Sequence, residues 1–419
     1  MVTNGEITVL QKKEKKNVAS PFFRSGNHKK HVDRDWLKLL IASYNTATNA
    51  NSKDSNLDKN GLQYGNDKAL IVAPMVEQSD LPFRLLCRKY GANLAFTPMI
   101  HARYFVTKQS YREKMWKKPA DMEAHRDDKT DLQCLDKPII AQICGSNKRI
   151  LLKAAKILEN DVDAIDLNCG CPTKTAKRGR YGAFLLQSDD FLVDTVQHLA
   201  ENLSCPLTVK VRLLPDKEGN IDLEKSLLLY EKLVNAGASM LTIHGRTRFQ
   251  KGADTGKANW DCIRQVVEKL GERIPIIANG NIQNLDDVRE CFALTSVDGV
   301  MSSESILEYP PLYTESNTKA VNFKRTGPGR HQIAREYLDL CQLYPPDKGG
   351  GGTGMQCVRM HIDTFLHEDW KYKPDLRETM LRVSDISGLY EIVQLLEDFH
   401  HEKGHRVENE QSSWYLRHR

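Results

Sequence analysis

From residue 70 onward, short apolar runs recur along the chain, and each is bounded by polar residues, glycine or proline. Near-continuous apolar runs are typical of strands in a parallel sheet that is buried on both faces. Eight of them occupy 70–76, 94–100, 138–145, 164–170, 207–213, 240–246, 275–282 and 299–305. Apolar positions with helical spacing lie between most of these runs, at 80–90, 148–159, 189–202, 223–235 and 261–270. The alternation predicts an α/β protein built on one (β/α)₈ TIM barrel, a fold that takes about 250 residues.

An open, doubly wound sheet is the alternative to a barrel. Its dinucleotide-binding form requires a glycine-rich turn after the first strand, but the residues Val72-Ala73-Pro74-Met75 contain no glycine. After about residue 315 the pattern becomes helical, with helices predicted over 331–343 and 375–399 and a glycine-rich loop between them. We therefore expect a smaller, all-helical domain after the barrel.

The pattern divides the chain into four parts. They are a polar, basic extension (1–68), the barrel (69–315), the helical domain (316–400) and a tail (401–419). In the extension, the stretch 36–41 predicts a short helix, and the remainder is too polar to bury enough surface to fold alone. The lysines of the extension provide much of the net charge of +5, and they are compatible with a nuclear signal or with an extra RNA contact.

Composition narrows the class of protein. Of the 419 residues, 40% are apolar and 27% are charged, which is ordinary for a globular protein and excludes a mostly disordered or collagen-like chain. No apolar run approaches the 18 or so residues of a membrane helix, so no membrane partner is expected. The ten cysteines lack the paired spacing of a zinc site, and no secretory or transit segment is recognisable. We therefore expect reduced thiols, no metal, and a location in the cytoplasm, the nucleus or both.

Polar side chains gather where the predicted strands end, which is where the active sites of these barrels lie. Strand alternation places Thr208, Lys210 and Arg212 on one face, pointing into the barrel. Two buried cations are costly unless they are paired. An ion pair with Asp166 is one interpretation, but we favour an electron-rich ligand. His244 on the next strand is by itself more often a core histidine, and beside Lys210 it becomes a candidate for the same ligand.

The loops after the seventh and eighth strands commonly bind phosphate in this fold. Here they carry Asn279-Gly280-Asn281 and Ser303-Glu304, and Gly280 permits a close backbone approach. A tight turn that simply needs glycine explains Gly280 equally well. Cys171 stands on a Gly-Cys-Pro turn after the fourth strand, where a thiol could act as a nucleophile or as a proton donor. Other cysteines, such as Cys169, are expected to be inert core residues.

Basic residues concentrate on the loops around this mouth. The loop after Cys171 contains Lys174, Lys177, Arg178 and Arg180 without an acid, and the segments 103–118 and 246–251 add basic residues interleaved with aromatic ones. Any single run could be a solvated loop. Three runs on one rim instead favour a nucleic acid, with phosphates on the cations and exposed bases on the rings. The role of the partly acidic insertion 101–137, as a lid or as a spacer, stays open.

Taken together, the motifs resemble those of the tRNA-dihydrouridine synthases. The collinear matches, between about residues 70 and 310, are Ala73-Pro74-Met75-Val76, Tyr90-Gly91-Ala92, Asp166-Leu167-Asn168-Cys169-Gly170-Cys171-Pro172, Tyr181-Gly182-Ala183, His244-Gly245-Arg246-Thr247 and Asn279-Gly280-Asn281-Ile282. The stretch 176–184 is most similar to the eukaryotic branch that acts on positions 16 and 17 of the tRNA D-loop.

The resemblance implies an enzyme that uses FMN and NADPH to reduce uridines of tRNA to 5,6-dihydrouridine. Hydride would pass from the reduced flavin to C6 of uracil, and Cys171 would be the catalytic residue that donates a proton to C5. The residues implied at the flavin are Pro74, Met75, Val76, Gln142, Lys210, His244, Asn279, Gly280, Asn281, Ser303 and Glu304. Asn168 would orient the base, Lys174 and Arg178 would contact tRNA on the rim, and we add Arg212 as a candidate substrate contact.

Other functions remain compatible with parts of the pattern. The main alternative is a flavin-dependent TIM-barrel oxidoreductase that acts on a small molecule. A lyase that forms a Schiff base on Lys210, and a non-catalytic RNA-binding module, are further alternatives. For the tRNA enzyme we expect a monomer whose helical domain contributes to tRNA binding.

Overall fold

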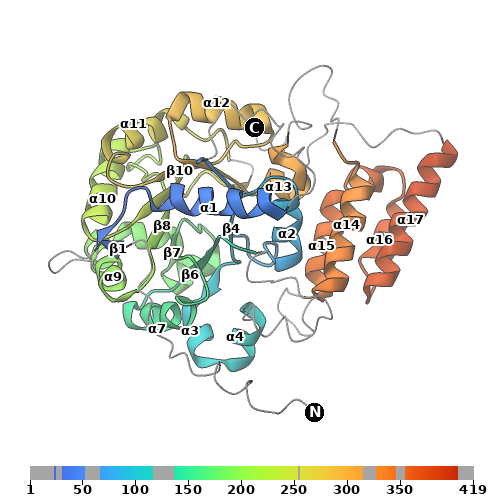
Figure 1. Ribbon diagram of the computed structural model, residues 1–419, viewed down its shortest axis with the longest axis horizontal. Helices are drawn as coiled ribbons and strands as arrows, with labels where there is room; N and C mark the ends of the chain where they lie inside the picture. Colours follow the sequence, from blue (N-terminus) through green and yellow to red (C-terminus); the bar gives the residue numbers. More distant parts are fainter. Residues whose placement is uncertain are drawn as a thin grey trace, which may run out of the picture.

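The computed structural model describes residues 23–24, 31–51, 67–116, 136–252, 255–314, 327–345 and 354–403. Within these residues, eight parallel strands form a closed ring in which each strand pairs with the next and the last strand pairs with the first (Figure 1). The strands of the ring are β3 (Ala69–Val72), β4 (Leu94–Phe96), β6 (Ile139–Cys144), β7 (Ala164–Cys169), β8 (Leu207–Arg212), β9 (Met240–His244), β10 (Ile276–Asn279) and β11 (Gly299–Ser302). The predicted barrel is confirmed, and each of the eight apolar runs supplies one strand.

Helices surround the strands, and several begin at a residue that caps them. They are α2 (Leu81–Lys89), α3 (Ala102–Thr107), α4 (Gln109–Met115), α7 (Lys148–Leu158), α8 (Lys174–Gly179), α9 (Asp189–Asn202), α10 (Leu223–Asn235), α11 (Trp260–Leu270), α12 (Leu285–Thr295) and α13 (Glu304–Glu308). The side chains of Asn147, Asp222, Asn259 and Asn284 accept a backbone N–H of the first turn. The short strand β5 (Ile100–His101) pairs with the end of β6. The five expected barrel helices are confirmed to within two residues, and α12 was not anticipated.

The helix α1 (Trp36–Asn51) crosses the front of the barrel in Figure 1. Trp36 is fully buried, and its indole N–H donates to the carbonyl of Ser239, just before β9. Arg34 binds the carboxylate of Asp298, just before β11, at 2.8 Å. Both contacts lie where strands begin, so α1 covers the end of the barrel opposite the expected active site. The short antiparallel pair β1 (Phe23–Arg24) and β2 (His31–Val32) precedes it.

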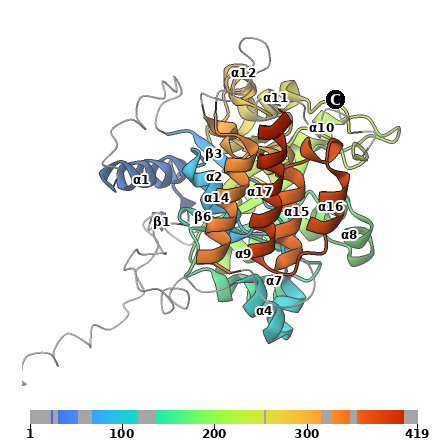
Figure 2. The same cartoon turned by 90° about the vertical axis from the view of Figure 1, so that its right-hand side faces the viewer.

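The C-terminal helices stand side by side along one flank of the barrel, next to α2, in both views (Figures 1 and 2). They are α14 (Arg330–Leu343), α15 (Met355–Phe365), α16 (Pro374–Met380) and α17 (Ile386–Lys403), with a 3₁₀ helix at Asp369–Lys371. A buried ion pair of 3.0 Å joins Arg330 of α14 to Glu308 of α13. The predicted all-helical region is confirmed, and no described helix is both long and apolar enough to cross a membrane.

The helix expected over 375–399 is wrong in detail, because it is two helices. The chain leaves helical conformation after α16, and the Asp385 carboxylate accepts the backbone N–H of Gly388 in the first turn of α17. Short polar side chains compete with helical hydrogen bonds and so favour a new start at this point. The helix α15 was not predicted, and one of the residues buried on its inner face, His361, does not register as an apolar position.

Candidate active site

The register of the barrel brings the expected polar residues together at the carboxyl ends of the strands. Lys210 of β8 pairs with Asn168 of β7, and Arg212 pairs with His244 of β9. His244 in turn pairs with Asn279 of β10. Residues in register on neighbouring parallel strands point to the same side of the sheet. Four neighbouring strands therefore present these five side chains to one region of the barrel mouth.

Lys210 is held by an amide rather than by an acid. Its ammonium donates to Oδ1 of Asn279 at 2.9 Å, and the Asn279 amide donates to the carbonyl of Met301 at 2.9 Å. Among the described residues, Lys210 forms no ion pair with Asp166. Burial lowers the pKa of Lys210 to about 8, and the nearby Arg212 acts in the same direction. Lys210 is therefore a half-buried cation whose charged form is disfavoured by its surroundings, which is consistent with an electron-rich ligand beside it.

A chain of hydrogen bonds links the barrel interior to the Cys171 loop. Asp166 accepts from the hydroxyl of Thr208 at 2.6 Å and from the amide of Gln142 at 2.8 Å. The other end of the Gln142 amide accepts from Asn168 at 2.7 Å. The Asn168 oxygen then accepts the backbone N–H of Cys171 at 3.0 Å. Because Gln142 is fully buried with both ends engaged, it fixes Asn168 from behind.

Cys171 lies on the loop between β7 and α8 with its thiol 3.4 Å from the hydroxyl of Thr173. The side chain is half-buried, whereas Cys169 is fully buried as expected. Gly182 passes directly behind Cys171 with a φ of +64°. A Cβ at Gly182 would lie 2.6 Å from the Cys171 carbonyl oxygen and 2.9 Å from its Cβ. The motif Tyr181-Gly182-Ala183 therefore contains a glycine that lets the chain pack against the Cys171 loop.

A cavity of about 150 Å³ opens at the ends of β9, β10 and β11, and Lys210 is connected to its wall through the hydrogen bond to Asn279. Its lining includes Arg212, His244, Arg246, Asn279, Gly280, Asn281, Ser303 and Glu304. Gly280 adopts a φ of +107°, and a Cβ there would lie 2.8 Å from Cβ of Ala258 and 3.2 Å from the His244 ring. Gly280 is thus required both by its backbone conformation and by the narrowness of the cavity wall.

The cavity is strongly positive. Arg246 donates from Nη1 to Nε2 of His244 at 3.0 Å, and from Nη2 to Oδ1 of Asn281 at 2.8 Å. Burial lowers the pKa of His244 well below its usual value, and Arg212, Lys210 and Arg246 lower it further. His244 is therefore neutral and accepts at Nε2, which leaves Nδ1–H as the donor of its ring. Cationic walls around a neutral histidine favour an anionic ligand such as a phosphate.

The structure places two residues of this cavity, Arg246 and Glu304, more specifically than the sequence does. Arg246, expected at the end of a strand and on the basic rim, lines the cavity itself. The exposed Glu304 carboxylate would repel a phosphate, so any contribution from this residue must come from the backbone N–H at the start of α13.

Arg212 supports the loops around the site. Its guanidinium donates to the carbonyl of Gly170 at 2.8 Å and to the carbonyl of Thr247 at 2.9 Å, and it is 8% exposed. It therefore ties the Cys171 loop to the loop after β9. The substrate contact expected of Arg212 stays a prediction.

The remaining expected flavin residues lie on the loop after β3. Pro74 is half-buried, Met75 is 8% exposed and Val76 is 54% exposed. An apolar side chain as exposed as Val76 is available to cover a ligand. The roles of Pro74, Met75 and Val76 stay predictions.

The rim combines exposed cations with aromatic rings. Lys174 and Arg178 are exposed on α8. The Arg248 guanidinium lies 4.7 Å from the ring of Phe249, which is 51% exposed, and the Lys108 ammonium lies 4.9 Å from the ring of Tyr104. These pairs place positive charge directly beside surfaces on which a base can stack.

Other members of the expected rim differ from the prediction. Phe105 is fully buried and belongs to the core, and Arg112 is tied to the carbonyl of Phe105. Lys117, Lys118 and most of the insertion that follows lie outside the described residues. Apart from Arg24 in β1, the basic residues of segment 1–30 also lie outside them.

Comparison with known proteins agrees with this geometry. The sequence profile of the family described as "Dihydrouridine synthase (Dus)" matches residues 71–403. The chain is 37% identical over 310 residues to the tRNA-dihydrouridine(16/17) synthase [NAD(P)(+)] of Saccharomyces cerevisiae, covering 74% of this chain and 68% of that protein. It is also 37% identical over 330 residues to the corresponding protein of Rattus norvegicus, covering 78% and 66%.

The tRNA-dihydrouridine(20a/20b) synthase of Saccharomyces cerevisiae is 31% identical over 249 residues, which is 59% of this chain and 62% of that protein. Among solved structures, a 2-naphthoyl-CoA reductase complex has a TM-score of 0.45 at 10% identity, with 59% of this chain and 49% of that chain covered, which is too low to bear on function. The aligned parts of this chain cover 68% and 66% of the first two relatives, and the family match over residues 71–403 includes both the barrel mouth and the C-terminal helices. The chain belongs to the dihydrouridine synthase family.

Proposed function

We propose that this protein reduces uridines in the D-loop of tRNA to 5,6-dihydrouridine, at positions 16 and 17, with FMN as its bound cofactor and NADPH as the reductant. The observation that supports it best is that a half-buried thiol, Cys171, and a half-buried cation, Lys210, lie at one barrel mouth. The relatives at 37% identity, which are tRNA-dihydrouridine(16/17) synthases, support the same reaction.

The donor set of the cavity fits FMN. The positive walls formed by Arg246 and Arg212 suit a phosphate, and the Gly280 turn leaves space that a Cβ would fill. The Lys210 ammonium and the ring N–H of His244 can donate to the carbonyl and nitrogen acceptors of a flavin ring. Reduced flavin, when bound, would supply the hydride that uracil takes at C6.

The residues of this chain would supply the proton and the orientation. Cys171 would donate the thiol proton to C5, so that the C5–C6 double bond is replaced by two new C–H bonds, and solvent would then reprotonate the thiolate. Asn168 would orient the base, with its own side chain fixed by Gln142. NADPH would regenerate the reduced cofactor by transferring one hydride, which carries the two electrons.

The rim would bind the RNA. Lys174 and Arg178 on α8 would contact phosphates, while the exposed rings of Tyr104 and Phe249 would stack on bases splayed out of the folded tRNA. In this proposal the helical domain (316–400) forms a further tRNA contact. The protein acts as a monomer in the cytoplasm or the nucleus, where tRNA is processed and used.

Two measurements test this proposal, one on the purified protein and one on tRNA from cells. Purified protein should carry a flavin spectrum that NADPH bleaches, and cells that lack the protein should lose dihydrouridine at positions 16 and 17 of their tRNAs. Cys171→Ala should keep the flavin spectrum and fail to restore dihydrouridine, whereas Cys262→Ala, on the outer helix α11, should restore it. Bleaching by NADPH without any change in tRNA dihydrouridine would instead favour a small-molecule substrate.

A further inference from the structure

The loop between β3 and α2, residues 73–80, has two faces with different partners. Towards the barrel mouth it presents Met75 and Val76, which the proposed function places against the flavin. Within the loop, the Ser79 hydroxyl bonds both the backbone N–H and the carbonyl of Met75, at 3.1 and 3.2 Å. The conformation of this loop therefore determines where its apolar side chains stand at the mouth.

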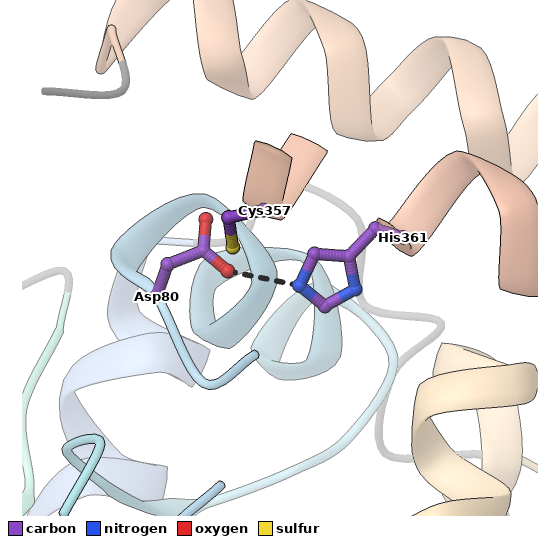
Figure 3. A group of neighbouring side chains, drawn as sticks. All are labelled: Asp80, Cys357 and His361. Carbon is purple, nitrogen blue, oxygen red and sulfur yellow. Dashed lines mark hydrogen bonds and ion pairs between the residues drawn. The ribbon is translucent and has the colours of Figure 1, made fainter. Parts of the chain in front are cut away.

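The rear of the same loop is held by three side chains of the helical domain. The thiol of Cys357 donates to the carbonyl of Glu77 at 2.7 Å. Asp80 accepts from Nε2 of His361 at 3.0 Å on one carboxylate oxygen, and from the Tyr337 hydroxyl at 3.2 Å on the other. Figure 3 shows Cys357 and His361 reaching from α15 towards the Asp80 carboxylate.

Two unusual backbone details coincide with these contacts. Glu77 adopts a φ of +63°, a left-handed conformation that residues with a Cβ rarely adopt. Asp80 occupies the N-cap position of α2, yet its side chain makes no capping hydrogen bond to that helix. An aspartate at this position ordinarily caps its own helix. Here its carboxylate binds the helical domain instead.

His361 is fixed in place independently of these hydrogen bonds. Its side chain is 1% exposed, and its ring stacks on Phe83 of α2 at a centroid distance of 4.5 Å. The Tyr337 ring lies 4.8 Å away on the α14 side. The donors that hold the loop therefore come from a rigid aromatic cluster formed jointly by α2, α14 and α15.

Asp80, Cys357 and His361 are residue types that also bind metals, and their ligand atoms lie within 4.8 Å of one another. Each already has a protein partner, however. Burial and the neighbouring Asp80 raise the pKa of the Cys357 thiol well above its usual value, so the thiol keeps the proton that it donates to Glu77. The Asp80 carboxylate, the Cys357 thiol and Nε2 of His361 are therefore all engaged in hydrogen bonds, while Nδ1 of His361 is buried without a partner among the described residues.

We propose that Tyr337, Cys357 and His361 are positioning residues for the cofactor: the helical domain holds loop 73–80 from behind and so maintains the apolar wall of the flavin site. This inference rests on the proposed function, because it assigns the wall to a flavin. It gives the helical domain a role in the barrel's chemistry that is separate from any contact with RNA.

The test uses two variants of His361 in the full chain. His361→Phe keeps the aromatic stacking and removes the donor to Asp80, whereas His361→Gln keeps a side-chain N–H donor. We expect the dissociation constant of FMN, titrated into apoprotein, to rise about tenfold in His361→Phe, the equivalent of one hydrogen bond to a charged group. In His361→Gln it should stay within about threefold of wild type. Hydrogen exchange at the backbone amides of Met75, Gln78 and Ser79 should quicken in His361→Phe.

Tyr90→Phe is the matched control, because it removes a different hydrogen bond between the barrel and the helical domain. The Tyr90 hydroxyl donates to Glu336 of α14 at 2.5 Å, at the far end of α2 from loop 73–80. This variant should leave FMN affinity and loop exchange unchanged. Wild-type exchange and affinity in His361→Phe would overturn the inference, as would stoichiometric zinc that is lost in Cys357→Ser. Failure of the wild-type chain to bind FMN would instead overturn the proposed function.

Discussion

The side-chain amide of Asn168 donates to the side-chain oxygen of Gln142 at 2.7 Å, and both residues lie below the mouth of the barrel. This contact orients Asn168 so that its own oxygen accepts the backbone N–H groups of Gly170 and Cys171. A buried amide in β6 thereby sets the position of a half-buried thiol on the loop after β7. Gln142 and the segment from Asn168 to Cys171 are separate in sequence and are joined by hydrogen bonds in the fold.

Asn168→Ala should therefore lower activity more than it lowers cofactor affinity. The substitution leaves the Gln142 oxygen and two loop N–H groups without their partner, at a cost of about 1–3 kcal/mol of stability. The Cys171 loop should lose its fixed orientation, and turnover should fall while the flavin spectrum persists. Asn147→Ala, which removes the cap of α7 on the outer surface, provides the control: stability should fall by about 1 kcal/mol with activity retained. Equal turnover in the two variants would refute the orienting role.

Titration of Lys210 should make the activity of the enzyme fall at alkaline pH. Because its pKa is lowered to about 8, its cation is present below that pH and is lost as the pH rises through it. We expect kcat/KM, which reports the free enzyme, to fall above about pH 8. Lys210→Arg keeps the charge at all of these pH values, so its profile should stay level through pH 9 even if its overall rate is lower. A limb that is unchanged in Lys210→Arg would assign the titration to another group.

Gly280→Ala should damage both folding and the cofactor site. Its φ of +107° and the 2.8 Å approach to Ala258 leave no room for a Cβ, and we expect a loss of about 2 kcal/mol in the free energy of unfolding together with weaker FMN binding. Gly219→Ala separates the two causes. Gly219 has a similar φ of +96°, but its nearest contact would be 3.6 Å, so it should lose stability without losing FMN affinity. Identical FMN binding in both alanine variants would argue against a tight wall at Gly280.

Asp166 should make stability depend on pH in an unusual direction. Burial raises its pKa to about 6, whereas an unfolded aspartate titrates near 3.9. Between these values the folded state binds more protons than the unfolded state, so stability falls as the pH rises from about 4 to about 6. The full penalty, about 3 kcal/mol, is present above pH 6.

Urea unfolding of the wild type and of Asp166→Asn across this range measures the effect. The free energy of unfolding of Asp166→Asn, relative to wild type, should increase with pH and then level off. The raised pKa of Asp163 contributes in the same direction in both proteins and should cancel in the difference. Parallel pH profiles for the two proteins would show that Asp166 does not titrate in this window.

The order of elements in the barrel followed from local pattern alone. A strand buried on both faces has to be apolar throughout, and a helix on the outside has to be apolar on one side. Both patterns can therefore be recognised in a short stretch of consecutive residues. The placement of Lys210 and His244 at the mouth followed as well, because the carboxyl ends of parallel strands share one edge. The break between α16 and α17 did not follow from the pattern. The residues between the two helices have only a weak preference for or against a helix, and the hydrogen bond from Gly388 to Asp385 decides where α17 begins.

Contacts between distant parts of the chain were decided only by the tertiary structure. Nothing in the neighbourhood of Arg212 indicates that its guanidinium bonds two loop carbonyls, or that Arg246 faces His244 inside the cavity. Likewise, Asp80 has the sequence position of an ordinary helix cap, and only the packing of α15 against α2 makes it the acceptor for His361. Sequence periodicity determines which face of an element is buried. Which partner a polar side chain finds depends on geometry that exists only once the barrel has closed and the C-terminal helices have docked.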